Sequence, residues 1–138
     1  MFVAYRKNLT EGLKERTKWF DGPNNVWYWS NENNIPETDS YSINVSLVAD
    51  LGHIHIVYES QNSIMYKYAR TRSLNGPWEY DAVLNLSTGS GFSQNKYPNV
   101  SLSLDGGHYV MVSWLGIYLA ALDKQMGKEQ DESIRRYA

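Results

Sequence analysis

The sequence contains no cysteine, which excludes disulfide bonds, thiolate catalysis and cysteine-ligated metal sites. It has no uninterrupted apolar run of about 18 residues, so we expect no membrane-spanning segment. Its 13 basic and 15 acidic residues give a net charge of -2, which argues against binding of nucleic acid through a basic surface. It also has neither a phosphate loop nor a Gly-rich nucleotide-binding motif, so we predict no cofactor.

Aromatic residues, in contrast, are abundant. The 11 Tyr, 5 Trp and 3 Phe make up 14% of the 138 residues. Tyr and Trp suit half-buried sheet surfaces and binding faces, because each combines a large apolar ring with a polar group. Charged residues make up 20% and hydrophobic residues 42%, a balance typical of a folded chain rather than a disordered one. The length suits one domain or part of one.

A repeat of 53 to 55 residues runs through the chain. The segment NVSLVADLGH at residues 44–53 returns as NVSLSLDGGH at residues 99–108, with seven of ten positions identical. A second echo relates RTKWFDGP at residues 16–23 to RTRSLNGP at residues 70–77, and each is soon followed by a tryptophan, Trp27 or Trp78. Tyr5 aligns with Tyr58 in the same repeat. The chain therefore holds about two and a half copies of one structural unit.

The middle copy of this unit has the pattern of four short strands. Apolar residues alternate with polar ones over residues 43–49, which predicts a half-buried strand, and Gly52 then permits a tight turn. Residues 53–59, 64–70 and 78–86 are rich in β-branched and aromatic residues and predict three further strands. Four short antiparallel strands, repeated about every 40 to 55 residues, are typical of a β-propeller blade.

We therefore predict an all-β fold of four-stranded antiparallel meander blades, followed by a short C-terminal helix. The blades occupy residues 1–122 and divide into a partial blade, a full blade and a second partial blade at residues 1–40, 41–96 and 97–122. The last predicted strand covers residues 117–122. The tail, residues 123–138, loses the alternation and has acidic residues early and arginines late, which favours a helix. The alternative is a helix over residues 117–126 in place of the last strand.

The number of blades predicts a need for partners. A closed propeller uses about four to eight blades, so two and a half blades would leave two apolar sheet faces in water. We therefore expect the chain to form a homo-oligomer, to pair with other chains or to belong to a longer propeller. A stack that is capped by its own tail is the remaining alternative.

The residues of the repeat also follow a known family pattern. The middle copy has an Asp-x-Gly turn, a strand ending in an aromatic residue, a Tyr-containing strand and Gly-x-Trp before its last strand. The residues that carry this pattern are Asp50, Gly52, Tyr58, Tyr66, Tyr68, Gly76 and Trp78, with Asp105, Gly107 and Trp114 in the next copy. This arrangement resembles the sialidase-like, or BNR-type, β-propeller repeat over most of residues 2–122. Residues 73–78 also resemble a segment of five-bladed glycosidase propellers.

Such repeats occur in secreted glycosidases, lectins and cell-surface proteins. The resemblance therefore implies carbohydrate binding and an extracellular or cell-surface location. The sialidase arginine motif has no clear counterpart, and the catalytic carboxylates of the glycosidase families have no assigned positions in this chain. Asp50 and Asp105 occupy the same turn of successive units, so we interpret both as turn residues rather than as a catalytic pair.

Five residues are candidates for ligand binding. Trp29 shares a strand face with Trp27 but has no counterpart in the repeat, so it could stack on a sugar ring, whereas we expect Trp27 to lie between blades. Glu59 follows an aromatic residue at a strand end where no structural role requires a carboxylate, and its counterparts in the repeat are Arg6 or Trp114. The predicted binding residues are Arg6, Trp29, Tyr58, Glu59 and Trp114.

Two further patterns have structural interpretations. His53 and His55 lie on one face of a strand and could hold a metal, but His53 recurs as His108, so we predict a structural role and no metal site. Asn44 and Asn99 begin Asn-x-Ser sequons at equivalent strand positions. We interpret them as outward-facing polar residues of strands rather than as glycan acceptors.

Together these observations predict a non-catalytic module that binds carbohydrate or protein, or acts as a scaffold, and is built from sialidase-like propeller blades. The alternative is part of a glycoside hydrolase whose active site is completed by residues outside this chain. A purely structural propeller segment is the third hypothesis.

Overall fold

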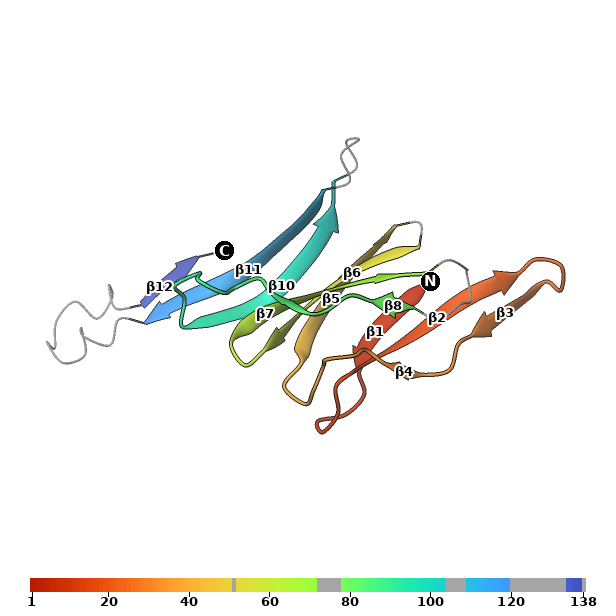
Figure 1. Ribbon diagram of the computed structural model, residues 1–138, viewed down its shortest axis with the longest axis horizontal. Coiled ribbons are helices and arrows are strands. Elements are labelled where there is room, and N and C mark those ends of the chain that lie inside the picture. The colour runs from red at the N-terminus through yellow and green to blue at the C-terminus, as the bar shows by residue number, and fades with distance from the viewer. Residues whose placement is uncertain (51, 72–77, 104–108, 120–133, 138) are drawn as a thin grey trace, which may run out of the picture.

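The computed structural model describes residues 1–50, 52–71, 78–103, 109–119 and 134–137. The regular structure in these residues is β-strand, and antiparallel pairing joins the strands into three sheets. Figure 1 shows the sheets following one another along the long axis of the molecule. The prediction of an all-β fold is therefore confirmed. The described part of the chain has no helix that could span a membrane.

The first sheet contains β1 (Phe2–Arg6), β2 (Leu13–Asp21), β3 (Val26–Trp29) and β4 (Asn33–Asn34). β2 lies in the centre and pairs with β1 along one edge. Its other edge pairs with β4 near the start of the strand and with β3 near its end. The outermost strand of this sheet is thus broken into two short pieces.

The second sheet contains β5 (Ile43–Asp50), β6 (His53–Ser60), β7 (Ser63–Arg70), β8 (Glu79–Tyr80) and β9 (Leu84–Asn85). Its strands follow in chain order, and β8 and β9 pair with opposite ends of β7, as β3 and β4 do with β2. Gln61 and Asn62 join β6 to β7 with φ values of 48° and 67°. Positive φ at both positions is what a two-residue turn needs to match the twist of its strands.

The third sheet contains β10 (Gln94–Leu102), β11 (Val110–Leu119) and β12 (Ile134–Tyr137). β11 continues to Leu119 without a turn, so the separate strand predicted over 117–122 and the alternative helix over 117–126 are both wrong for residues 117–119. A glycine such as Gly116 could end a strand, but here its missing side chain leaves room for the Phe92 ring to lie against β11.

The predicted C-terminal helix is wrong for Ile134–Tyr137, which form β12 and pair with β11. The physical reason is that β11 would otherwise present an open edge of backbone N–H and C=O groups, and a strand can satisfy them where a helix cannot. Residues 123–133 and 138 of the predicted helix lie outside the described part of the chain.

Hydrogen bonds confirm the internal repeat. The four strands of the first sheet match β6 to β9 of the second, with Tyr5 at the position of Tyr58 as the sequence predicts. Equivalent backbone bonds recur, from Ile35 to Leu13 at 2.9 Å and from Leu86 to Ile64 at 2.8 Å. β5 and β10 also match, since each has a bulge after its first residues.

One sequence echo does not correspond to a structural repeat. Arg16 lies in the middle of β2, whereas Arg70 is the last residue of β7. The strand register makes Arg16 the counterpart of Lys67 instead. The prediction that residues 16–23 and 70–77 are equivalent is therefore wrong for residues 70–71, the described part of the second segment.

An apolar core joins the first and second sheets. The buried residues of this core are Leu13, Ile35, Ile54, Ile56, Tyr58 and Ala69. Trp78 closes one side, with its ring 5.2 Å from that of Phe2 in an edge-to-face contact. Its indole N–H donates to Thr17 Oγ1 at 2.8 Å, so the polar atom of this side chain is also satisfied.

The contact between the second and third sheets is more polar. β10 lies against β5, β6 and β7. Ser46 Oγ donates to Asn99 Oδ1 at 3.2 Å and accepts from Val100 N–H at 3.3 Å. Asn95 accepts from the Trp114 indole N–H at 2.9 Å and donates to the Asn62 carbonyl at 3.0 Å. Asn99 therefore bridges two sheets, which the interpretation as an outward-facing strand residue did not anticipate.

A polar cluster lies between the first and second sheets, with Lys67 and Glu15 buried and Glu37 at its exposed edge. Lys67 is fully buried and pairs with Glu37 at 2.6 Å, which lowers the pKa of that carboxyl. Glu15 is 3% exposed and accepts from Asn33 Nδ2 at 3.0 Å through Oε1. Among the described residues, Glu15 Oε2 and Tyr80 OH have no hydrogen-bond partner. Burial raises the pKa of Glu15, because its charged form is poorly solvated there.

We predict that Glu15→Gln raises the free energy of unfolding by about 1 kcal/mol at pH 7.5, because a buried, incompletely bonded carboxylate is removed. The pKa of Glu15 is higher in the folded state, so its contribution to stability is full below the unfolded pKa and lost as pH rises through the folded pKa. The stability difference between variant and parent should therefore shrink at pH 4. Urea unfolding followed by circular dichroism at both pH values measures it.

Glu37→Gln is the matched control, with the opposite sign. The pKa of Glu37 is lowered in the folded state, so its contribution to stability is present above the unfolded pKa and lost in acid. This variant should be destabilised at pH 7.5, since the buried Lys67 ammonium loses its partner. Equal and pH-independent effects of the two variants would contradict this account of the cluster.

Candidate functional site

A pocket of about 330 Å³ opens where the three sheets meet, and we call it the inter-sheet pocket. β1, β5, β6 and β10 each contribute one residue to it, and the segment before β5 and the β6–β7 turn contribute the others. Its lining residues are Arg6, Ser40, Tyr41, Ile43, Glu59, Gln61, Asn62 and Lys96. Residues far apart in the sequence thus converge at the same end of neighbouring strands.

Glu59 is the acidic group of this pocket. It is 5% exposed, and its Oε2 accepts a hydrogen bond from the Tyr97 backbone N–H at 3.0 Å and another from Asn44 Nδ2. No group among the described residues donates to Glu59 Oε1. One carboxylate oxygen is thus held by the protein, and the other can accept a hydrogen bond from a ligand.

Left-handed backbone conformations gather around this carboxylate. Asn44 and Tyr97, the two donors to Glu59, have φ values of 50° and 54°, and the pocket residues Gln61 and Asn62 have φ values of 48° and 67°. Such conformations cost roughly 1 kcal/mol or more each in residues other than glycine, and they concentrate at sites where geometry matters more than stability. The two-residue turn accounts for Gln61 and Asn62, so the strain at Asn44 and Tyr97 is what indicates that the Glu59 environment is held in a specific arrangement.

The two cations of the pocket differ in their availability. The Arg6 guanidinium donates to the backbone carbonyls of Ser40 at 2.6 Å and Asn8 at 3.1 Å, so it ties two chain segments together and shapes the pocket wall. The Lys96 side chain makes no hydrogen bond or ion pair with the described residues. Its ammonium group is therefore the cation that a ligand can engage.

The structure separates the five predicted binding residues. Arg6 and Glu59, counterparts in the repeat, meet in the inter-sheet pocket. Tyr58 lies in the core at 1% exposure, and burial raises its pKa to about 12. Trp114 donates to Asn95 behind the pocket, and the strand register makes Ser113 rather than Trp114 the counterpart of Glu59.

Several pocket residues were missed by the sequence analysis. They are Tyr41, Gln61, Asn62 and Lys96. The polar pair Gln61 and Asn62 indicated a turn in the sequence, but nothing indicated that it lines a pocket. Lys96 comes into the pocket only because the third sheet packs against the second, and no sequence pattern carries that information.

Trp29 lies on a different part of the surface, which we call the outer aromatic face. This face of the β2–β3 hairpin consists of Arg16, Lys18, Phe20, Trp27 and Trp29. Lys18 Nζ lies 5.1 Å and 5.5 Å from the ring centroids of Trp27 and Trp29, within the range of cation–π attraction. Trp27 is 59% exposed, and no sheet of the described chain covers this face, so Trp27 does not lie between blades within one copy.

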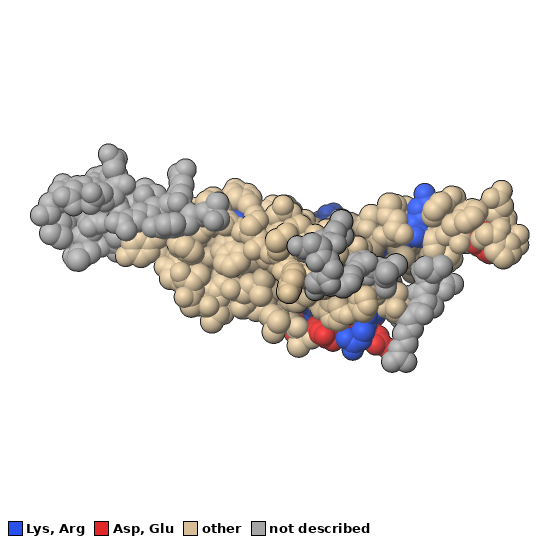
Figure 2. All heavy atoms as spheres, turned by 90° about the horizontal axis from the view of Figure 1, so that it is seen from above, with Lys and Arg blue, Asp and Glu red and all other residues tan. Residues whose placement is uncertain are grey.

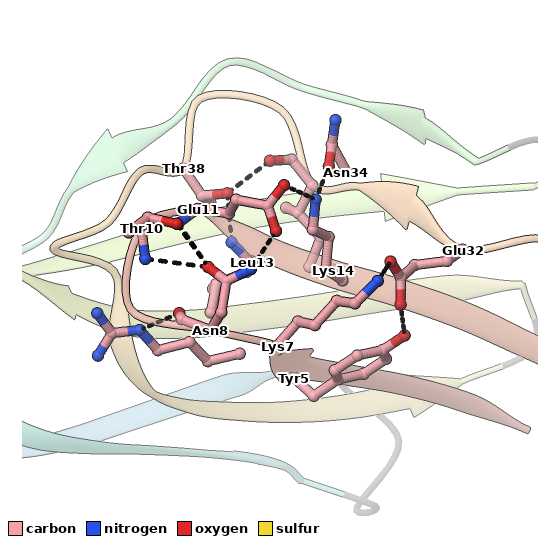
Figure 3. Close-up of polar contacts among 12 residues, drawn as sticks. Tyr5, Lys7, Asn8, Thr10, Glu11, Leu13, Lys14, Glu32, Asn34 and Thr38 are labelled. Atoms are coloured by element: carbon pink, nitrogen blue, oxygen red, sulfur yellow. Dashed lines mark hydrogen bonds and ion pairs between the residues drawn. The ribbon is translucent and has the colours of Figure 1, made fainter.

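A second hollow, of about 320 Å³, lies beside the start of β2. Figure 3 shows that two of its charged groups, Glu11 and Lys14, have partners within the protein, and the third, Glu37, pairs with Lys67. Lys14 donates to Asn34 at 2.6 Å and pairs with Glu11 at 3.4 Å, and the nearby Lys7 pairs with Glu32 at 2.9 Å. It therefore offers a ligand fewer unpaired groups than the inter-sheet pocket does.

The two histidines of β6 interact with tyrosines of β7. His55 Nδ1 lies 2.8 Å from Tyr66 OH, and His53 Nδ1 bonds to Tyr68 OH. Burial raises the pKa of Tyr66. No group of three or more metal-ligating side chains occurs among the described residues.

We predict that Glu59→Ala lowers the free energy of unfolding by about 2–3 kcal/mol, because the Tyr97 N–H and the Asn44 amide lose their charged acceptor. Glu59→Gln keeps an acceptor oxygen, so we expect it to lower the free energy of unfolding by no more than about half as much as Glu59→Ala does. Urea unfolding at pH 7 compares the two variants. An Ala variant as stable as the parent would show that these hydrogen bonds do not hold the pocket.

Comparison with known proteins places the chain in no family. No protein-family model, curated protein or solved structure matches it. Its function must therefore be inferred from the geometry of its own residues.

Proposed function

We propose that this chain is a non-catalytic carbohydrate-binding module whose three sheets are propeller-type blades. The blade interpretation is supported by the order of the sheets, which follow the chain and pack face to face. It is also supported by the shared plan of the first and second sheets, including the broken outer strand. Radial repetition of such sheets is how propellers cover the faces and edges of short strands.

The inter-sheet pocket supports a sugar as the ligand. Sugar hydroxyl groups donate and accept hydrogen bonds, and the pocket offers an acceptor in Glu59 and donors in Lys96 and the Gln61 amide. Tyr41, which is 59% exposed, adds an aromatic ring on which the apolar face of a sugar can stack. The volume of about 330 Å³ lies at the small end of ligand pockets, as suits one or two sugar rings.

The carboxylate of Glu59 carries this proposal. Its Oε2 accepts hydrogen bonds from the protein, and its Oε1 can accept one from a ligand. A carboxylate fixed in this way can orient a bound polyol and select for it. Glycoside hydrolysis normally requires two carboxylates that flank the scissile bond. Glu59 is the one carboxylate among the described lining residues, so binding is favoured over hydrolysis.

We predict that Lys96→Ala and Tyr41→Ala each weaken glycan binding at least tenfold. The first removes a hydrogen-bond donor and the second removes a stacking ring, while both leave Glu59 in place. A glycan array identifies the ligand, and titration calorimetry then measures the dissociation constant of each variant. Arg70→Ala is the control, since Arg70 is exposed outside the pocket and pairs with Asp81 and Glu79.

Failure of the parent protein to bind any glycan on the array would contradict the proposal, as would unchanged affinity in both pocket variants. Turnover of an aryl-glycoside that disappears in Glu59→Gln would instead establish the hydrolase alternative.

A further inference from the structure

The outer aromatic face corresponds, position by position, to a face that is buried in the second sheet. Trp29 pairs with Lys18 across β3 and β2, as Tyr80 pairs with Ala69 across β8 and β7. In the same register, Trp27 is the counterpart of Trp78. The repeat in the sequence paired the same two tryptophans.

The equivalent tryptophans have different surroundings. Trp78 packs edge-to-face on Phe2 and donates to Thr17, both of the neighbouring first sheet. Trp27 is 59% exposed, and Trp29 and Phe20 are each 43% exposed. The second sheet has the first sheet beside this face, whereas the described residues place no sheet beside the same face of the first. The outer aromatic face is thus equivalent to the surface through which the second sheet packs on the first, but within the described chain no sheet packs on it.

The opposite end of the stack presents the complementary surface. Val100 and Val112 pair across β10 and β11, and Val100 is buried where β10 lies against the second sheet. Alternation turns the next pair, Ser101 and Met111, to the outside. Met111 is 54% exposed, and Tyr109, immediately before β11, is 67% exposed. We call this surface the outer face of the third sheet.

The charged side chains of the outer aromatic face already have partners within the chain. Figure 2, which views the molecule from above, shows charged atoms gathered at only a few places among the described residues. The cations of the outer aromatic face, Arg16 and Lys18, already lie over its tryptophan rings. Ser101, Tyr109 and Met111, the exposed residues near the free end of the β10–β11 pair on this side, carry no charge.

We propose that two copies of this chain associate head to tail, with the outer aromatic face of each copy packed on the outer face of the third sheet of the other. This contact continues the direction in which the first, second and third sheets already pack within one copy. Two copies with three sheets each supply six sheets, within the range of about four to eight that closed propellers use. The inference rests on the blade interpretation of the proposed function but not on the sugar ligand.

Light scattering on the full chain tests the association. The expected mass is twice the 15.9 kDa of one chain. Trp29→Glu should raise the dissociation constant of the dimer at least tenfold, because it places a charge in the contact. Tyr28→Glu is the matched control, with a side chain 42% exposed on the opposite face of the same strand, and should change the constant less than threefold.

Cysteine cross-linking tests the direction of the contact, because the chain has no native cysteine. Trp27→Cys and Met111→Cys are prepared as separate variants and treated with a short bismaleimide, alone and mixed. The mixture should give a cross-linked dimer, and each variant alone should give none.

A monomer at all concentrations up to millimolar would overturn the inference, as would cross-linking of Trp27→Cys to itself. The result is distinguishable from failure of the proposed function, because one copy supplies every residue of the inter-sheet pocket. Glycan binding by a monomer would reject the ring alone, and a dimer of the predicted kind without glycan binding would reject the sugar ligand alone.

Discussion

The structure depends on one constraint: a sheet with two apolar or aromatic faces needs a neighbour on each of them. The second sheet has both neighbours, and Ile54, Ile56 and Val57 on its central strand are essentially inaccessible to water. Burying a large apolar side chain contributes about 1.5–3 kcal/mol, and this burial drives the sheets to stack. Among the described residues the first and third sheets each have one neighbouring sheet, and the outer face of each carries exposed aromatic residues.

The two internal contacts between sheets serve different purposes. The first and second sheets meet through an apolar core that supplies stability. The second and third sheets meet through hydrogen bonds of Ser46, Asn95 and Asn99, which depend on orientation and therefore fix how the third sheet sits. That placement brings Lys96 to the same pocket as Glu59. The polar contact therefore positions the candidate site, and the apolar contact supports it.

Much of the fold was predictable because it follows local rules. Alternation and turn residues predicted β5, β6 and β7 of the middle copy, whereas the single strand predicted over 78–86 is two short pieces, β8 and β9. The repeat predicted the equivalence of Tyr5 with Tyr58 and of Trp27 with Trp78. Features that depend on tertiary contacts were not predictable. β12 forms because β11 offers an open edge, and a pattern of charges in the tail cannot reveal that edge.

The site was predictable only in part, for the same reason. Glu59 and Arg6 stood out because the repeat has unlike residues at one position, and the structure brings both to one pocket. The strained donors at Asn44 and Tyr97 could not be foreseen, since left-handed backbone at Asn and Tyr leaves no mark in a single sequence.

The most direct test of the central constraint is the solvent accessibility of Trp27 compared with that of Trp78, measured by hydroxyl-radical footprinting over a range of protein concentrations. If exposed sheet faces require a neighbour, Trp27 should be labelled rapidly in dilute protein and become as protected as Trp78 when the protein is concentrated. Rapid labelling of Trp27 at every concentration, with Trp78 always protected, would show that an uncovered face is stable in water and would contradict the account.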